Sequence, residues 1–296
     1  MQKKFKNVNI IGFGKVGSAY AYALQDCGYH IKYIISERFK NINSLSRHYP
    51  GCVFNKKISF LSLINSDIII ISVQDDKIIE IVKIISQYNK NLTGKIFFHT
   101  SGALSSDILS KLGIHRNYIG SMHPIQTFRE LSVKNNDLLK DIYYGIEGDE
   151  TSIKFFKILC KNLSSKYIEL KKEDKLLYHI SCVISSNYLI THLFLLEEVF
   201  VQISNADIMK VFMPLVNNTL VNIVRFGIPK SLTGPISRND INTIKKHIAL
   251  LKKNNPEILK YYSFMSGKTV EIALKQGSIN NNQAKEIKKL LKKYSK

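Results

Sequence analysis

The decisive stretch is Val8-Asn9-Ile10-Ile11-Gly12-Phe13-Gly14-Lys15-Val16-Gly17, in which a short apolar run leads directly into the pattern G-x-G-x-x-G. Small, helix-forming residues follow, so we expect a strand, a glycine turn and a helix in that order, the context in which this pattern indicates a dinucleotide site. The first glycine permits the tight turn, the second lets the backbone approach a pyrophosphate, and the third lets the helix pack on the strand. The N–H groups and the dipole at the helix start favour phosphate charge. The alternative is a glycine-rich turn that binds no nucleotide. The predicted cofactor-binding residues of this loop are Gly12, Phe13, Gly14, Lys15, Val16 and Gly17.

Further apolar runs alternate with helical segments up to residue 149. The runs that we expect to be strands cover residues 31–35, 68–73, 95–99, 118–122 and 142–147. This alternation predicts an α/β domain over residues 1–149 with a doubly wound parallel sheet. Because ligands bind at the carboxyl ends of such strands, Val73 and Thr100 are predicted to contact the cofactor.

The character of the chain changes after Gly148. Apart from a short expected strand at 166–170, the pattern is helical, with helices over 153–163, 174–203, 206–226, 239–253, 256–276 and 282–294. We therefore predict a mostly α-helical second domain over residues 150–296, which binds substrate and forms a homodimer. The long apolar helix after Asp174 supplies the surface for that dimer.

The choice of cofactor depends on the end of the second strand. Ser36 stands at its tip with Arg38 two residues on, and a small hydroxyl with an Arg suits the 2′-phosphate of NADP. Glu37 would instead hold the ribose of NAD if the register moved by one residue. We favour NADP(H); the alternative is that Ser36 and Arg38 are ordinary loop residues.

Composition limits the class of partner. The net charge is +20, but only six of the 43 basic residues are Arg, and the Lys residues are scattered apart from a basic tail at 285–296. Recognition of bases and phosphates depends on Arg forks, so we expect a solvated surface and no nucleic-acid partner. The four cysteines form no C-x-x-C pair, which disfavours a metal site or a disulfide framework. No segment has 18 uninterrupted apolar residues, and the apolar run near the N-terminus is too short for a signal peptide. The expected location is the cytoplasm, without a membrane partner.

The helix near Asp174 carries polar residues within an apolar run. On one continuous helix, Lys175, His179 and Ser186 would fall within roughly 40° of one another, and Asn187 about 80° from His179. Such a face offers a proton donor and orienting groups for a carbonyl reductase. The alternative is a buried His with Ser and Asn bonded inside the helix. A separate Gly-Pro turn ends in Arg238, which could clamp a carboxylate or be a solvated turn residue.

Several segments together resemble the Rossmann-like proteins with a C-terminal domain of the DUF2520 type, relatives of the 6-phosphogluconate dehydrogenase-like and pyrroline-carboxylate reductase-like oxidoreductases. Besides the glycine loop, the segments are His99-Thr100-Ser101-Gly102-Ala103-Leu104, Ser121-Met122-His123-Pro124-Ile125-Gln126-Thr127-Phe128, Glu147-Gly148-Asp149, Asp174-Lys175-Leu176-Leu177-Tyr178-His179, Ser185-Ser186-Asn187-Tyr188-Leu189 and Leu232-Thr233-Gly234-Pro235-Ile236-Ser237-Arg238. Asn239 stands where the family usually has Gly.

The resemblance implies an NADP-dependent oxidoreductase. Some family members are similar to an alternative type of ketopantoate reductase, which reduces 2-dehydropantoate to pantoate in pantothenate biosynthesis. A reductase of an imine or a dehydrogenase of a 3-hydroxy acid is the alternative, as is an NADP-binding protein without turnover. The motif leaves the acid open among Lys175, His179 and Asn187; we favour His179, with Asn187 orienting the substrate and Lys175 holding its charge. The predicted substrate-binding residues are Ser101, His123, Gln126, Ser186 and Arg238.

Overall fold

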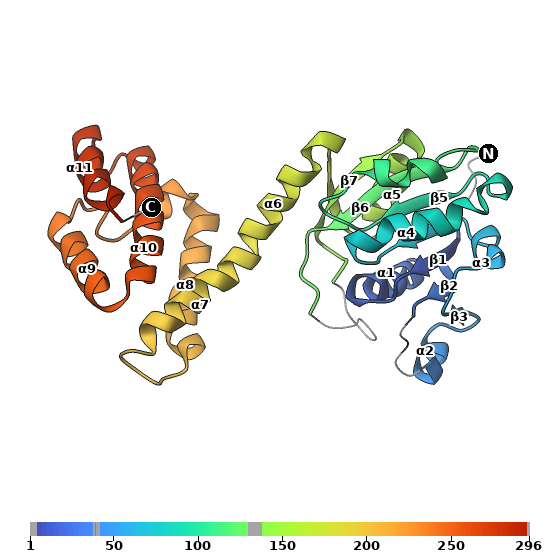
Figure 1. Ribbon diagram of the computed structural model, residues 1–296, viewed down its shortest axis with the longest axis horizontal. Coiled ribbons are helices and arrows are strands. Elements are labelled where there is room, and N and C mark those ends of the chain that lie inside the picture. The colour runs from blue at the N-terminus through green and yellow to red at the C-terminus, as the bar shows by residue number, and fades with distance from the viewer. Residues whose placement is uncertain (1–4, 38, 40–41, 130–137, 295–296) are drawn as a thin grey trace. The chain divides into compact units, whose positions relative to one another are not determined.

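The computed structural model describes residues 5–37, 39, 42–129 and 138–294 (Figure 1). Arg38, a predicted ligand of the 2′-phosphate, lies outside the described residues. The chain divides into two compact units, residues 1–188 and 189–296.

The first unit is built on one eight-stranded sheet with the strand order β3-β2-β1-β4-β5-β6-β7-β8. The strands are β1 Asn7–Ile11, β2 His30–Ile35, β3 Val53–Asn55, β4 Ile68–Ile71, β5 Ile96–His99, β6 Tyr118–Pro124, β7 Tyr143–Gly148 and β8 Lys166–Glu169. The chain runs outward from β1 to β3 and then returns to place β4 on the other side of β1. The carboxyl ends of β1 and β4 therefore form the switch point at which doubly wound sheets bind ligands.

The predicted fold class is confirmed, with one difference in strand direction. All neighbouring strands run parallel except β6 and β7, which are antiparallel. Antiparallel neighbours need no crossover helix. Accordingly, the described parts of the β6–β7 connection, residues 125–129 and 138–142, contain no helix.

Helices cover both faces of the sheet (Figure 1). On one face lie α1 Lys15–Asp26 and α5 Glu150–Asn162, and on the other α3 Phe60–Ile64, α4 Asp75–Ser86 and the 3-10 helix η2 Ser106–Leu112. Strand β4 shows the consequence: Ile68 and Ile70 enter the first core, whereas Ile69 and Ile71 enter the second. A strand buried on both faces reads as a continuous apolar run, which is why this strand could be identified from the sequence.

Three short elements were not predicted, namely α2 Ile42–His48, β3 and α3. The segment between β5 and β6 forms the 3-10 helix η2. The first compact unit also extends beyond the predicted boundary at residues 149/150, because β8 pairs in parallel with β7 and attaches α5 and β8 to the sheet.

The predicted helix over residues 174–203 is interrupted. After the 3-10 turn η3 Lys172–Asp174, helix α6 covers Lys175–Ser185 and α7 covers Asn187–Phe200. Serine hydroxyls near the break donate to backbone carbonyls, Ser181 Oγ to Leu177 O and Ser185 Oγ to Cys182 O, both at 3.0 Å. Such bonds compete with the helix and bend it.

The second unit is helical. Its elements after α7 are α8 Ile208–Phe226, the 3-10 turn η4 Pro229–Ser231, α9 Ile241–Asn254, α10 Pro256–Gln276 and α11 Asn281–Lys292. Side chains of α9, α10 and α11 form its core, among them Ile244, Val270 and Ile287. Helix α10 begins with a side-chain cap, since Asn255 accepts from Ile258 N and Pro256 occupies the first turn.

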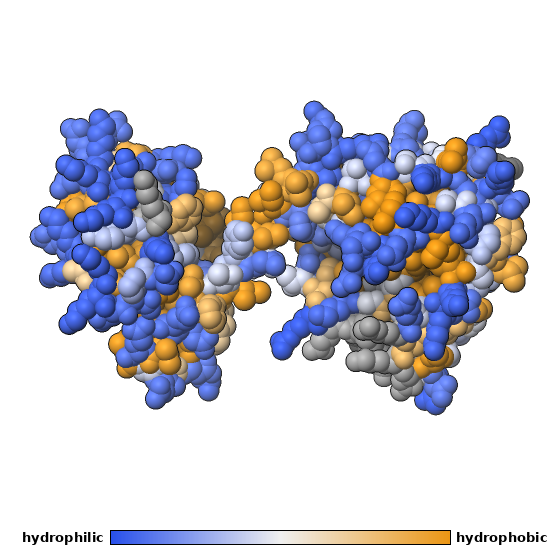
Figure 2. Space-filling view, in the orientation of Figure 1, coloured by the Kyte–Doolittle hydropathy of each residue, from blue (hydrophilic) through white to orange (hydrophobic). Residues whose placement is uncertain are grey.

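Several apolar side chains of α6, α7 and α8 are exposed to solvent. Figure 2 shows apolar surface, in orange, over the segment labelled α6 in Figure 1. Neither α7 nor α8 contributes a buried residue. The helical run over residues 172–200 is long and apolar enough, by length and composition, to cross a membrane. The sequence prediction of no such segment differs because it required an uninterrupted apolar run, whereas this run contains polar residues. Each of these helices therefore carries several exposed apolar side chains.

Candidate active site

The glycine loop lies between the carboxyl end of β1 and the start of α1. Gly12 has a φ of +96°, and a Cβ atom there would lie 2.6 Å from Ser72 O; a Cβ atom on Gly17 would lie 2.0 Å from Gly12 O. Ser72 Oγ, from the end of β4, donates to Gly12 O at 2.6 Å. The fold itself thus requires glycine at both positions, and the turn is fastened to the neighbouring strand.

Gly14 is different. Its φ is −88°, which any residue adopts, and a Cβ atom there would meet nothing within 4 Å. It is the N-cap residue of α1 and supplies no side-chain cap. Since the described residues do not require glycine here, the position fits the predicted close approach of a pyrophosphate to the backbone and to the positive end of the helix.

The other predicted cofactor residues occupy several settings. Val73 is half-buried just after β4, and Thr100 is buried just after β5 with its N–H donating to Ile71 O at 3.2 Å. Phe13 is buried and packs edge-on against Tyr49, whereas Lys15 is exposed. Because β1, β4 and β5 are neighbours in the sheet, the glycine loop, Val73 and Thr100 lie at one sheet edge. Ser36 is half-buried at the end of β2, and its N–H donates to Asn55 O.

Lys175 is the most deeply buried charge of the site. Only 1% of the residue is exposed, and its Nζ atom donates to Ser101 O at 3.0 Å and to Ser121 Oγ at 2.7 Å. Burial lowers the pKa of this ammonium to about 8. Helix α6 thereby places a cation with a lowered pKa at the carboxyl end of β5 and beside Ser121 of β6, an arrangement typical of functional lysines.

Two imidazoles meet next to this lysine. The rings of His123 on β6 and His179 on α6 have centroids 6.3 Å apart, and Gly102 leaves room for both: a Cβ atom there would lie 2.8 Å from His179 Cδ2 and 2.9 Å from His123 Nε2. Tyr178 OH lies 2.7 Å from His123 Nδ1. Burial first, and then the nearby cation of Lys175, lower the pKa of His123 to about 4, so its imidazole is neutral at physiological pH.

The Ser101 hydroxyl is held by the protein. It donates to Asp75 Oδ2 at 2.7 Å and accepts from the N–H groups of Ala103 and Leu104. His99 fixes the same loop, since its Nδ1 accepts from Ser101 N and its Nε2 lies 3.1 Å from Ser105 O. These contacts give the 101–106 loop a defined shape beside Lys175.

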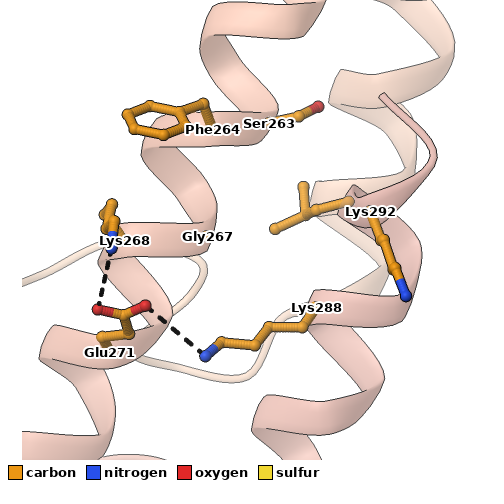
Figure 3. Close-up of a pocket in the computed structure, with 8 residues that line it drawn as sticks. Ser263, Phe264, Gly267, Lys268, Glu271, Lys288 and Lys292 are labelled. Carbon is orange, nitrogen blue, oxygen red and sulfur yellow. Dashed lines mark hydrogen bonds and ion pairs between the residues drawn. The ribbon is translucent and has the colours of Figure 1, made fainter. Parts of the chain in front are cut away.

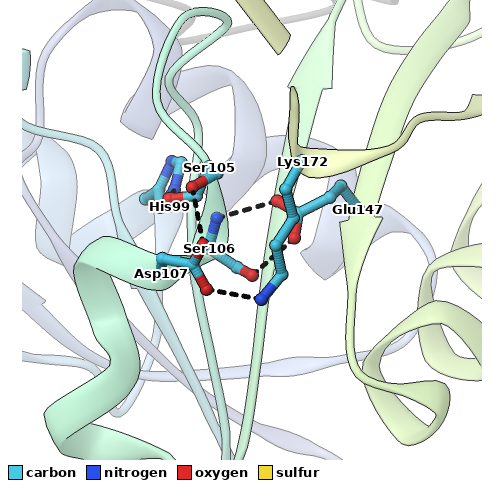
Figure 4. Close-up of polar contacts among 6 residues, drawn as sticks. All are labelled: His99, Ser105, Ser106, Asp107, Glu147 and Lys172. Carbon is cyan, nitrogen blue, oxygen red and sulfur yellow. Dashed lines mark hydrogen bonds and ion pairs between the residues drawn. The ribbon is translucent and has the colours of Figure 1, made fainter. Parts of the chain in front are cut away.

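A second polar group fastens this loop to β7 and α6 (Figure 4). Glu147, only 2% exposed, accepts from Ser106 N at 2.7 Å and from Ser106 Oγ at 2.6 Å. Lys172, just before α6, forms an ion pair with Asp107 on the surface. The buried carboxylate of Glu147 therefore holds the 101–106 loop in place, a role that we did not predict from the sequence.

Our sequence reasoning assigned no role to Asp75, Ser121, Glu147 or Tyr178. A usable signal existed for Glu147, an acidic residue inside an otherwise apolar strand, and for Asp75, which follows a buried strand at a helix start. No comparable signal marks Tyr178, because its contact with His123 depends on how α6 packs against β6 and β7.

The remaining predicted residues lie apart from these contacts. Gln126 is exposed, and its Oε1 accepts from Thr127 N. Ser186 is half-buried at the one-residue turn between α6 and α7, and Asn187 is exposed at the first position of α7. Arg238 is exposed in the second unit. Their roles in binding substrate stay predictions.

The second unit has a cavity of its own, of about 330 Å³, between α10 and α11 (Figure 3). Four of its eight lining residues are charged, and Glu271 bridges Lys268 at 3.5 Å and Lys288 at 3.8 Å. Since the imidazoles, Lys175 and the glycine loop all belong to the first unit, we place the chemistry there. Within the described ranges, no three His, Cys, Asp or Glu side chains are grouped closely enough to hold a metal ion.

Comparison with known proteins gives two family matches. Residues 1–124 match the model of the Rossmann-like domain, and residues 142–269 match the domain of unknown function DUF2520. No curated protein sequence matches the chain.

Solved structures share the fold over nearly the whole chain. Protein TM1727 from Thermotoga maritima is 23% identical, with a TM-score of 0.68, over 97% of this chain and 98% of that one. Pyrroline carboxylate reductase from Plasmodium falciparum, solved with NADP bound, is 13% identical, with a TM-score of 0.58, over 100% of both chains. Imine reductase BcSIRED from Bacillus cereus is 14% identical, with a TM-score of 0.53, over 97% of this chain and 92% of that one.

Proposed function

Since residues 1–124 belong to the Rossmann-like domain family and residues 142–269 to the DUF2520 family, we propose that this protein is an NADPH-dependent oxidoreductase. Two of the similar structures are those of a pyrroline carboxylate reductase and an imine reductase, which supports this reaction class. The glycine loop at the switch point of the sheet supports the cofactor.

Gly12 to Gly17 and the start of α1 would hold the pyrophosphate through backbone N–H groups, and Gly14 gives it room. Val73 and Thr100 would line the cofactor site at the ends of β4 and β5. Ser36 and Arg38 would bind the 2′-phosphate of NADPH. The carboxylate of Glu37 between them would repel this phosphate. When bound, the cofactor supplies a hydride.

The substrate that we propose is a 2-keto acid, and the buried ammonium of Lys175 is the observation that carries this choice. A positive charge in a poorly solvated site favours a carboxylate and the negative charge that develops on a reduced carbonyl oxygen. The same charge disfavours a protonated imine, the cationic substrate of the alternative reaction. Among 2-keto acids we propose 2-dehydropantoate, which would be reduced to pantoate, because of the resemblance to the alternative ketopantoate reductases.

In this reaction a hydride adds to C2 of the keto acid, and the C2–O double bond becomes an alkoxide. His179 gives its proton to that oxygen, and water returns a proton to the imidazole. Lys175 stabilises the anionic charge, and Asn187 orients the substrate. Ser101, His123, Gln126, Ser186 and Arg238 complete the proposed substrate contacts.

Purified protein tests the proposal through NADPH oxidation with ketopantoate, other 2-keto acids, 3-hydroxy acids in the reverse direction and cyclic imines. We expect kcat/KM to be highest for ketopantoate and to fall roughly 100-fold or more in His179→Ala. A preference for imines would favour the alternative substrate. Tight NADPH binding without turnover of any substrate would favour a non-catalytic protein.

We also propose that a second copy of this chain covers the apolar surface of α7 and α8. Phe194 is 55% exposed and Val224 86% exposed, although both stand on apolar helices. A bilayer is a poor occupant for the run 172–200, because its first helix carries Lys175 and His179, which contact the sheet end. Light scattering of the purified protein, without detergent, should therefore give the mass of a dimer. The Val224→Glu variant should give the mass of a monomer. A monomer in the unmodified protein would contradict this proposal. We propose a cytoplasmic location, and neither nucleic acid nor a membrane is among the partners that we propose.

A further inference from the structure

We propose that Tyr178 is a positioning residue for His123: its hydroxyl donates to His123 Nδ1 and so keeps the imidazole proton on Nε2, the nitrogen beside Gly102. Tyr178 OH and His123 Nδ1 are 2.7 Å apart. On the other side of the ring, Nε2 lies 2.9 Å from the place that a Cβ atom on Gly102 would occupy. The two ring nitrogens thus face different surroundings. The catalytic meaning of this inference rests on the proposed function.

The chemistry of the two groups supports the proposed direction of the hydrogen bond. Burial raises the pKa of Tyr178, so the phenol keeps its proton and can donate. His123 is neutral, because burial first, and then the nearby ammonium of Lys175, lower its pKa to about 4. A neutral imidazole has one donor and one acceptor nitrogen. Accepting at Nδ1 therefore leaves Nε2 as the donor.

The sheet holds Tyr178 in place. Gly145 on β7 has no side chain where the phenol ring lies, and a Cβ atom there would come within 2.6 Å of Tyr178 Cζ and OH. The His123 and Tyr178 rings meet edge-on, with centroids 5.6 Å apart and planes at 88°. Cys182, one turn further along α6, also faces the phenol and contributes to its raised pKa. Strands β6 and β7 and helix α6 together fix the pair.

A fixed Nε2–H beside Gly102 would give the substrate oxygen a neutral hydrogen-bond donor next to His179. Because the pKa of His123 is lowered to about 4, this donor does not titrate near neutral pH. It would orient the carbonyl oxygen, while the proton itself comes from His179. Donors of this kind, preorganised at a developing oxyanion, contribute strongly to catalysis.

Nitrogen NMR of the full-length protein, labelled with ¹⁵N-histidine, tests the inference without substrate or turnover. The His123 signals are identified by their loss in His123→Gln. We expect a protonated Nε2 and an unprotonated, hydrogen-bonded Nδ1 in the unmodified protein. In Tyr178→Phe the Nδ1 signal should shift toward that of a free nitrogen, and kcat should fall roughly 10- to 100-fold at unchanged NADPH affinity. Tyr167→Phe, at an exposed position, should change neither.

A protonated Nδ1 in the unmodified protein, or a His123 spectrum that does not change in Tyr178→Phe, would overturn the inference. If Tyr178→Phe does not fold, Gly145→Ala provides the second test, since it displaces the phenol and should shift the same Nδ1 signal. An active reductase with an unchanged spectrum would overturn only this inference. The expected spectrum without any reductase activity would contradict only the proposed function.

Discussion

The Nζ atom of Lys175 lies 2.7 Å from the Oγ atom of Ser121, which joins helix α6 to the middle of β6. A second bond from the same ammonium, 3.0 Å to Ser101 O, reaches the loop that follows β5. One buried cation thus links β6 and the end of β5 with the helix that carries both Tyr178 and His179. The adjacent strand ends, of β1 and β4, hold the glycine loop. This arrangement connects the substrate chemistry that we propose to the cofactor that we propose.

The pH dependence of activity should report Lys175. Its pKa is lowered to about 8, so the fraction of ammonium falls as the pH rises through that value, and kcat/KM for a keto acid should decline above about pH 8. Lys175→Met should reduce kcat/KM roughly 100- to 10,000-fold and remove this decline. An alkaline decline that survives in Lys175→Met would assign it to another group.

The same lysine should make stability depend on pH. Its folded-state pKa of about 8 lies below the value of 10.5 for an unperturbed lysine, so between these values the unfolded chain binds more protons. The contribution of Lys175 to the free energy of unfolding should therefore rise from about pH 8 to about pH 10.5 and be least favourable below about pH 8. Urea unfolding at several pH values, compared with Lys175→Met, isolates this contribution. Parallel pH profiles for the two proteins would contradict it.

Gly14→Ala should separate cofactor binding from folding. A Cβ atom at this position meets open space, so the loss of stability should be about 1 kcal/mol or less, whereas NADPH affinity should fall roughly tenfold or more. Gly17→Ala is the matched contrast, because its Cβ atom would overlap Gly12 O and destabilise the fold by about 3 kcal/mol. Thermal unfolding and NADPH fluorescence titration measure both effects. Unchanged NADPH affinity in Gly14→Ala would argue against the pyrophosphate site.

Gly102→Ala should damage the site without unfolding the protein. The new methyl group would press on His179 Cδ2 and His123 Nε2, so we expect kcat to fall roughly tenfold or more, with only a small change in melting temperature. Gly113→Ala is the control, since its Cβ atom would make ordinary contacts at 3.4 Å with Ile119. Equal kcat values for the two variants would place the reaction away from the imidazoles.

Glu147→Ala should cost stability as well as activity. It leaves the N–H and the hydroxyl of Ser106 without their buried acceptor, a loss of about 1–3 kcal/mol in the free energy of unfolding. Lys172→Ala removes the neighbouring ion pair at the surface and should cost about 1 kcal/mol or less. Chemical denaturation compares the two. A larger loss in Lys172→Ala would show that the surface pair, and not the buried carboxylate, fastens the loop.

The sequence predicted the sheet because its strands are buried on both faces. The run Ile68–Ile71 is apolar at every position, and the glycine loop combines a turn requirement at Gly12 with a packing requirement at Gly17. These demands are local, and both appear in the order of residues. The caps of the second unit are local in the same sense: Asp207 and Asn255 each accept N–H groups of the helix that follows.

What the sequence did not reveal depends on packing across elements. The helical spacing that grouped Asn187 with His179 assumed a regular helix, but a one-residue turn at Ser186, with φ −120° and ψ −65°, lies between α6 and α7. Tyr178 approaches His123 only because β7 offers Gly145 beneath the ring, and Glu147 reaches Ser106 only through the pairing of β6 with β7. No spacing within a single segment encodes these contacts.

Transfer of deuterium from NADPH to product tests the central claim most directly. Ketopantoate is incubated with the protein and with NADPH deuterated at either face of C4 of the nicotinamide, and pantoate is analysed by mass spectrometry. The account predicts that one of the two cofactors, and only one, delivers deuterium to C2 of pantoate, because a fixed site presents a single face of the ring. Protein that binds NADPH but yields no labelled product from ketopantoate with either cofactor would contradict it.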